Sequence, residues 1–165
     1  MTKKQKTKTK ALDVAFYFIK KGLDEKKPIT NKKLQKLVYY AQAWSLVLNN
    51  EKLFKEKIEA WVHGPAIPSL YEKFMQFGSK PIVLELSELE HINFSKKQEE
   101  LLSSIWQVYG KYPADYLEAL THSELPWQEA RGGMPDSQPS NNIIKIETIK
   151  EFYARKLREN SKRGD

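Results

Sequence analysis

The amino-acid sequence predicts a mainly α fold (α+β with minor strands), built as a single compact helical domain with a few short β segments. Three observations support this fold class. Apolar residues recur at helical spacing in several separate segments, whereas alternation with a period of two is confined to short stretches. Hydrophobic residues make up 40% and aromatic residues 12% of the 165-residue chain, which is enough for one core.

The N-terminal third of the chain predicts two helices. Residues 11–23 place apolar side chains at helical spacing. After a polar break, Thr30 or Asn31 is expected to cap a second helix, because its side-chain oxygen can accept a hydrogen bond from a backbone N–H of the first turn. One face of this helix is expected to be buried, and that face consists of Leu34, Leu37, Val38, Ala41, Ser45 and Leu48.

The central stretch EAWVHGPAIPSLYEKF predicts the end of a strand, a corner and a helix. Residues 53–63 alternate partially with a period of two, so they are expected to form a short strand that Gly64-Pro65 ends. Pro68 suits the first turn of a helix, where its missing N–H costs nothing. This helix is expected to continue to Gly78, a natural left-handed cap.

The C-terminal half predicts further helices. Residues 80–94 are expected to form a short extended piece. Ser95 and Gln98 have the spacing of a capping box, which opens a fourth helix. A loop is expected at RGGMPDSQPSNN, because Gly, Pro, Ser and Asn dominate it. Two further helical segments are expected to start at Pro113 and Pro126. A last helix is expected to run through Ile149, Phe152 and Tyr153.

The positive charge lies at the two ends of the chain. The net charge is +7: residues 1–10 carry five lysines and no acid, residues 151–165 contribute +2, and residues 11–150 are neutral. We therefore predict a basic disordered tail at 1–10, a folded domain at 11–157 and a basic tail at 158–165.

A nucleic acid is not the expected main partner of this protein. A nucleic-acid-binding domain concentrates positive charge on a folded face, and the body of this chain is neutral. A DNA-binding regulator of its own operon is the alternative, because the N-terminal lysines can contact phosphates.

The composition also indicates the cellular compartment of the protein. The chain has no cysteine, which excludes disulfides and thiolate metal sites and fits a reducing cytoplasm. No apolar run approaches the roughly 20 residues of a membrane span, and the N-terminus lacks the apolar segment of a signal peptide. We therefore expect a cytoplasmic protein without a membrane partner.

No motif for catalysis, cofactor binding or metal binding is present. The chain lacks HExxH, GxSxG, P-loop and GxGxxG patterns. The three histidines, His63, His91 and His122, are scattered, and His63 and His122 are expected to bond the backbone of their turns. Ser123 follows His122, but adjacent residues rarely present both side chains to one substrate. We predict a non-enzymatic protein with no cofactor and no metal.

Two aromatic side chains are candidates for contact with a protein partner. Trp61 alternates away from the apolar side of its segment, and Tyr39 lies off the main stripe of the second helix. Exposed aromatic residues beside rigid turns are typical of binding hot spots. The alternative is that each ring packs beneath a neighbouring helix.

The blocks LQKLVYYAQAW, IEAWVHGPAIPSLYEKF and THSELPW, in this order and spacing, resemble the Panacea domain, the SocA-like family of bacterial and phage antitoxins. The resemblance covers roughly Leu12 to Tyr153. It implies a mainly helical antitoxin domain that binds and neutralises a cognate toxin protein encoded by a neighbouring gene, in settings such as prophages and phage defence. Some family members act instead as adaptors that deliver the toxin to a protease.

The resemblance also yields the candidate residues. We expect the Gly64-Pro65 corner to be scaffold that orients Trp61 and His63, so that motif residues maintain the fold and toxin contacts lie elsewhere. Direct contact between motif residues and the toxin is the alternative. Other residues that match the family motifs are Leu34, Gln35, Leu37, Glu59 and Ala60. The family-motif or partner-binding candidates are Lys36, Tyr39, Tyr40, Trp61, His63, Gly64, Pro65, Tyr71, Thr121, His122, Pro126 and Trp127.

Overall fold

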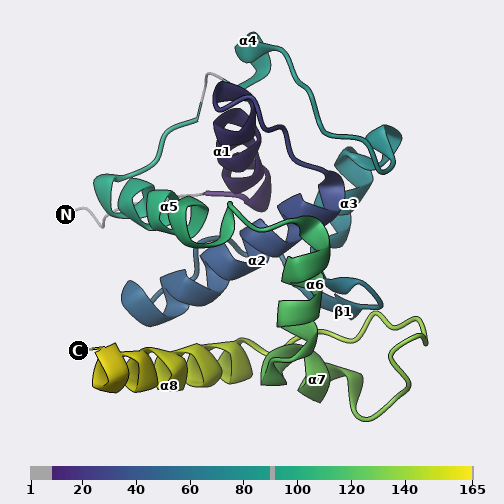
Figure 1. The fold of residues 1–165 in the computed structure, drawn as a ribbon, viewed down its shortest axis with the longest axis vertical. Helices are drawn as coiled ribbons and strands as arrows, with labels where there is room; N and C mark the ends of the chain where they lie inside the picture. Colours follow the sequence, from purple (N-terminus) through teal and green to yellow (C-terminus); the bar gives the residue numbers. More distant parts are fainter. Residues whose placement is uncertain (1–8, 90–91, 165) are drawn as a thin grey trace, which may run out of the picture.

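The computed structural model describes residues 9–89 and 92–164, so most of the expected N-terminal tail lies outside the described residues. The fold is mainly α-helical, as predicted, with a small antiparallel sheet. Its elements in chain order are α1 (Ala11–Asp24), α2 (Asn31–Leu48), β1 (Glu59–Trp61), β2 (Gly64–Ala66), α3 (Pro68–Lys73), the 3₁₀ turn η1 (Met75–Phe77), α4 (Leu86–Leu89), α5 (Lys96–Tyr109), α6 (Ala114–His122), α7 (Leu125–Arg131) and α8 (Ile146–Gly164). In Figure 1, α2 crosses the centre, with α1 and α5 above it, α8 below it, and α6 and α7 near the sheet.

Helix α2 is buried on nearly every side, which corrects the expectation of a single buried face. Helices α1, α5, α6 and α8 and strand β2 all contact it. Tyr39, which lies off the expected stripe, is only 1% exposed, and Tyr40 is fully buried. Leu48, expected within the stripe, is exposed at the last residue of the helix. A helix enclosed by neighbours needs apolar or hydrogen-bonded side chains all round, so its sequence carries no strong amphipathic signal.

The starts of the helices agree with the predicted capping signals. At α2, Thr30 Oγ1 accepts a hydrogen bond from Lys33 N at 3.3 Å. At α5, Ser95 Oγ accepts from Gln98 N at 3.1 Å while Ser95 N donates to Gln98 Oε1 at 2.9 Å, which is the predicted capping box. A proline lies at the N-cap of α6 and in the first turn of α7, also as predicted.

Three segments differ from the expected elements. Residues 80–94 contain the short helix α4 and are not simply extended. Helix α3 ends at Lys73 and is followed by η1 before Gly78, which has a φ of 58°. At the C-terminus, α8 extends to Gly164, so the expected boundary after residue 157 falls within a helix.

Gly64 and Pro65 begin a strand, whereas we expected them to end one. Strands β1 and β2 pair antiparallel, with Trp61 opposite Gly64 and Ala60 opposite Pro65. The two residues between the strands, Val62 and His63 in sequence, therefore form the turn of a β-hairpin. The sequence signal was read as a stop because Gly-Pro usually terminates a strand.

The hairpin tolerates Pro65 because the opposite residue bonds elsewhere. Ala60 N donates to Asn142 O at 2.8 Å, and Ala60 O accepts from Arg131 Nη1 at 3.0 Å. Both backbone groups of Ala60 therefore point away from β2. The missing N–H of Pro65 costs no hydrogen bond of the ladder.

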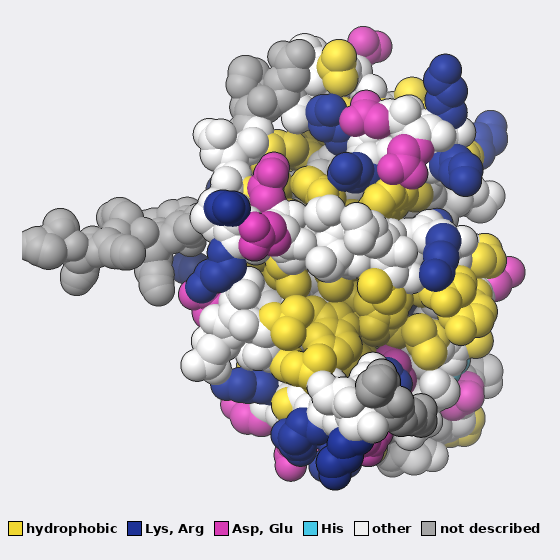
Figure 2. Space-filling model, turned by 60° about the vertical axis from the view of Figure 1, so that its left-hand side comes forward, with side chains coloured by type: hydrophobic (Ala, Val, Ile, Leu, Met, Phe, Trp, Pro, Cys, Tyr) yellow, Lys and Arg dark blue, Asp and Glu magenta, His cyan; other side chains and the backbone are white. Residues whose placement is uncertain are grey.

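A hydrophobic surface, here called the α5–α8 face, is exposed where these two helices flank α2. Leu48 of α2, Val108 of α5 and Leu157 of α8 are 53%, 53% and 38% exposed. Figure 2 shows hydrophobic side chains gathered in the middle of this side of the molecule, with basic and acidic side chains around them. Exposed apolar surfaces of this kind are candidates for protein contact.

A buried carboxylate joins α2 to α8. Tyr40 OH and Tyr153 OH donate to Glu124 Oε1 at 2.9 and 2.6 Å, and Tyr39 OH lies 3.1 Å from Tyr153 OH. Tyr40 also stacks on Tyr109 of α5, with ring centroids 4.0 Å apart. Burial raises the pKa of the Glu124 carboxyl, although the tyrosine hydrogen bonds oppose the rise. This cluster therefore ties three helices to the junction between α6 and α7.

Replacing Glu124 with Gln should make stability less dependent on pH. The amide oxygen still accepts hydrogen bonds from the tyrosines. The folded state holds the Glu124 proton more tightly than the unfolded chain does, so ionisation lowers stability as the pH rises from the ordinary value of 4.5 through the raised pKa. Melting temperatures of both proteins from about pH 5 to about pH 8 should shift in favour of the variant as the pH rises. A difference that does not change with pH would contradict this account.

Candidate functional site

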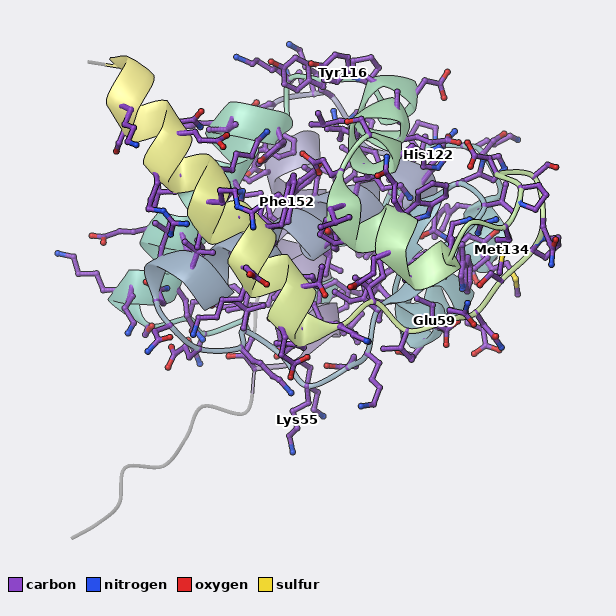
Figure 3. The ribbon with its side chains drawn as sticks, turned by 90° about the horizontal axis from the view of Figure 1, so that it is seen from below. Lys55, Glu59, Tyr116, His122, Met134 and Phe152 are labelled. Atoms are coloured by element: carbon purple, nitrogen blue, oxygen red, sulfur yellow. The ribbon has the colours of Figure 1, made fainter. Side chains whose placement is uncertain are left out.

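An open groove, here called the hairpin groove, lies beside β1 and β2. Its volume is about 950 Å³, within the range of ligand-binding clefts. Its walls come from α2, the hairpin, α3, the turn after η1 and the loop 139–141. In Figure 3, Glu59 of the hairpin, Met134 of the loop and His122 lie on one side of the view, and α8 runs along the other.

Buried side chains of α2 hold the hairpin by hydrogen bonds to its backbone. Gln35 Oε1 accepts from Ile67 N at 2.8 Å, and Lys36 Nζ donates to Pro65 O at 3.2 Å. Asn31 donates from Nδ2 to a carbonyl of α3 at 3.0 Å and accepts from Gln35 Nε2 at 2.9 Å. These bonds fix β2 and the start of α3 against α2.

Side chains from the α6–α7 region hold the other strand. Trp127 Nε1 donates to Trp61 O at 2.8 Å. The ring of His122 stacks on Trp127 with centroids 3.8 Å apart. Arg131 donates to a β1 carbonyl at 3.0 Å and to a carbonyl of the following loop at 2.9 Å. The hairpin is therefore clamped from both sides.

Two aromatic rings form an apolar wall of the groove. The rings of Trp61 and Tyr71 meet edge to face, with centroids 5.2 Å apart and an interplanar angle of 72°. Trp61 Nε1 donates to Glu59 Oε1 at 2.8 Å, so this carboxylate already has a partner. Tyr71 is 36% exposed and Trp61 is partly exposed, which leaves both rings accessible from the groove.

Glu118 of α6 is the acidic centre of the site. It forms an ion pair with Lys32, its Oε2 lies 3.0 Å from His63 Nδ1, and the same oxygen lies 4.0 Å from His122 Nε2. Burial alone would raise the pKa of the Glu118 carboxyl, but hydrogen bonds from Lys32 and His63 hold it below its ordinary value. The expectation that His63 bonds the backbone of its turn is wrong, because its partner is this carboxylate.

Lys36 is a buried cation at the groove wall. It is only 2% exposed, and burial lowers its pKa from 10.5 to about 7, with Glu118 opposing this shift and Lys32 adding to it. Within the described residues, no carboxylate lies within ion-pairing distance of its Nζ. Its hydrogen-bond acceptor is the Pro65 carbonyl. A charge in this position is expensive unless a counter-charge arrives.

Gly64 is required by the close approach of Lys36 to the hairpin. Its φ is +107°, a region that side chains disfavour. A Cβ at this position would stand 2.6 Å from Lys36 Cε, 3.0 Å from Thr121 Oγ1 and 3.3 Å from Lys36 Nζ. The glycine therefore permits α2, α6 and the hairpin to meet.

Most candidate residues converge on the hairpin, but few of them are exposed. Tyr39 and Tyr40 lie instead in the buried cluster around Glu124. The buried candidates are Lys36, Tyr39, Tyr40, Gly64, Pro65, Thr121, Pro126 and Trp127, and those that keep exposed surface are Trp61, His63, Tyr71 and His122.

Sequence reasoning missed the polar residues that organise the site. Glu118 and Arg131 lie outside the three motif blocks, and no spacing rule singles them out. Glu124 lies inside THSELPW, where its position between motif residues was an available signal. Asn31 was considered only as a helix cap, whereas its amide links α2 to α3.

The described residues, 9–89 and 92–164, contain no group of three or more His, Asp or Glu side chains placed to hold a metal ion. His91 lies outside the described residues. Among the same residues, no helix is both long and apolar enough to cross a membrane. The groups that line the hairpin groove suit molecular recognition: an aromatic wall, the buried amino group of Lys36 and the Glu59 carboxylate, which Trp61 already binds.

Comparison with known proteins gives two matches. The family model described as "Antitoxin SocA-like, Panacea domain" matches residues 34–128, which include the hairpin and, apart from Arg131, the side chains that bind its strands. The chain is also 33% identical over 116 residues to Antitoxin SocA of Caulobacter vibrioides (strain NA1000 / CB15N). That match covers 64% of this chain and 62% of the relative, so the chain spans less than two thirds of the relative's length. No solved structure gives a significant match.

Replacing Gly64 with Ala should destabilise the fold by roughly 2 kcal/mol or more, because the new Cβ meets Lys36 and Thr121 and the backbone angle is unfavourable. For a chain of this size, we expect a fall in melting temperature of about 4 °C or more. Gly133→Ala is the matched control, since Gly133 also has a positive φ of 85° but nothing within 4 Å of its Cβ position. Equal losses in the two variants would contradict the role of close approach.

Replacing Lys36 with Met should remove a pH dependence of stability. The unfolded chain binds the lysine proton more tightly than the folded state, so stability rises with pH between about 7 and 10.5. The slope is on the order of 1.4 kcal/mol per pH unit within that window. Chemical denaturation of both proteins from about pH 7 to about pH 9, below tyrosine ionisation, measures it. The variant should be at least as stable as the wild type at about pH 7, and its free energy of unfolding should rise less with pH. Equal increases in the two proteins would contradict this prediction.

Proposed function

Because the chain belongs to the SocA-like family of Panacea-domain antitoxins, we propose that it is an antitoxin that neutralises a cognate toxin protein by direct protein–protein binding. The observation that carries the proposal is the match of the family model to residues 34–128. The partner is the product of a neighbouring gene, and the proposed site of action is the cytoplasm.

The geometry supports a binding role. Motif residues and Arg131 clamp the two-stranded hairpin between α2 and the α6–α7 region by hydrogen bonds to the backbone of residues 60–67. A hairpin of this length does not hold its shape alone in water. Held in this way, it presents a fixed surface, and fixed surfaces lose less conformational entropy on binding. These residues serve non-catalytic roles in this account.

Two alternative modes of action predict different experimental outcomes. In one, the protein acts as an adaptor that delivers the toxin to a protease. In the other, it regulates its own operon by binding DNA through the lysines of residues 1–10. The clamp around the hairpin serves either of the protein-binding modes.

Co-expression with the neighbouring gene product, followed by co-purification, tests the proposal. We expect the partner to arrest growth when induced alone, and this protein to restore growth and to purify with the partner as a stable complex. Growth restored together with loss of the partner protein would indicate protease delivery. A partner that is toxic but neither bound nor neutralised would contradict the antitoxin proposal.

The DNA-binding mode needs a separate measurement. Deleting residues 1–10 should leave neutralisation intact, because they lie outside the family match. If the protein regulates its operon through this tail, the full chain shifts operator DNA at low salt, and the shift weakens with added salt and with the deletion. The absence of any shift by the full chain would remove this mode.

A further inference from the structure

The hairpin groove contains a buried amino group whose presence the fold does not explain. Lys36 is buried at its wall, and within the described residues its Nζ bonds one backbone carbonyl and pairs with no carboxylate. A single neutral acceptor is a poor substitute for the water that an ammonium loses. An apolar side chain of similar length would fill the same space at lower cost. Buried ionisable groups of this kind cluster at functional sites.

The other charged groups around Lys36 are already matched. Lys32, one turn earlier on α2, pairs with Asp115 and Glu118 of α6. His63 of the hairpin turn also binds Glu118, and His122 lies 4.0 Å from it. Lys36 is therefore the cation of the groove that a ligand can pair with.

The rest of the groove favours an apolar group beside that charge. Trp61 and Tyr71 line the same groove as Lys36 and present accessible aromatic surface. Gly64, which also lines it, carries no side chain above Lys36, and a Cβ there would stand 3.3 Å from Nζ.

We propose that the hairpin groove binds an acidic segment of the toxin protein, with one Asp or Glu carboxylate paired to Lys36 Nζ and a neighbouring apolar side chain against Trp61 and Tyr71. This inference rests on the proposed antitoxin function and assigns its contact site. One unmatched ammonium suits one carboxylate, whereas a nucleic-acid backbone requires several cations that release counterions. Pairing in a desolvated groove gives a strong, charge-assisted contact.

Matched substitutions on α2 test the proposal. Lys36→Met removes the charge and keeps the length of the side chain. Lys33→Met is the control: Lys33 also donates to a backbone carbonyl, that of Gly110, but does not line the groove. With the co-purified toxin as the probe, calorimetry at about pH 7 should show at least a tenfold loss of affinity for Lys36→Met and less than a threefold change for Lys33→Met. The melting temperature of Lys36→Met alone should not fall.

A second groove variant keeps the test decisive if Lys36→Met fails to fold. Tyr71→Ser removes an exposed ring but leaves the backbone carbonyl that Asn31 binds. It should weaken toxin binding while the fold persists. Neutralising the acidic residues of the toxin one at a time, as Asp→Asn or Glu→Gln, should identify one position whose loss adds nothing to that of Lys36→Met.

Three results would overturn the proposal. Unchanged affinity in both groove variants would place the contact elsewhere while the antitoxin function stands. Loss of binding in Val108→Asp, with both groove variants unaffected, would assign the contact to the α5–α8 face. The absence of any complex with the wild-type protein would overturn the groove proposal and the proposed function together.

Discussion

The fold depends on hydrogen bonds from buried polar side chains of α2 to the backbone of segments that are not helical. Because neighbours cover α2 on nearly every side, its polar residues must find partners inside the protein. Lys36 binds the hairpin, and Gln35 binds the backbone directly after it. Gln42 binds the backbone of Leu53 and Phe54 in the loop that precedes the hairpin. The same bonds that satisfy these side chains therefore set the positions of two irregular segments. Removing Gln35 or Gln42 would leave a buried backbone group without its partner as well. For Lys36, losing the bond to the Pro65 carbonyl is offset by removing a buried ammonium.

This arrangement connects stability to recognition. The hairpin is too short to stand alone, so its shape is imposed by α2 on one side and by Trp127 and Arg131 on the other. The groove beside it inherits that rigidity. Lys36 belongs to both systems, since it bonds a hairpin carbonyl and also lines the groove. The motifs alone offered two alternatives, that their residues maintain the fold or that they contact the toxin. One residue, such as Lys36, can serve both roles.

The sequence predicted features that depend on neighbouring residues, such as helix caps. It did not predict features that depend on contacts between distant segments. The caps at Thr30 and Ser95 were identified correctly because each signal lies within one helical turn. The burial of Tyr39 was not, because it depends on α8, more than a hundred residues away in the chain. Gly64 was recognised as special, but its reason, the approach of Lys36 and Thr121, is a tertiary contact. For the site, the motif blocks located the hairpin. The role of Glu118 gave no signal in the sequence, because a single glutamate in a helix usually faces solvent and its partners here come from distant segments.

Hydrogen–deuterium exchange of the protein, alone and in complex with its co-purified toxin, tests most directly whether the clamped hairpin and its groove are the recognition surface. The account predicts slower exchange on binding in residues 59–66, in residues 71–79 and in the loop 139–141, which form the hairpin groove. Helices α5 and α8 should exchange at similar rates in both states. Slower exchange confined to α5 and α8, with the hairpin unchanged, would contradict the account and make the groove a structural feature only.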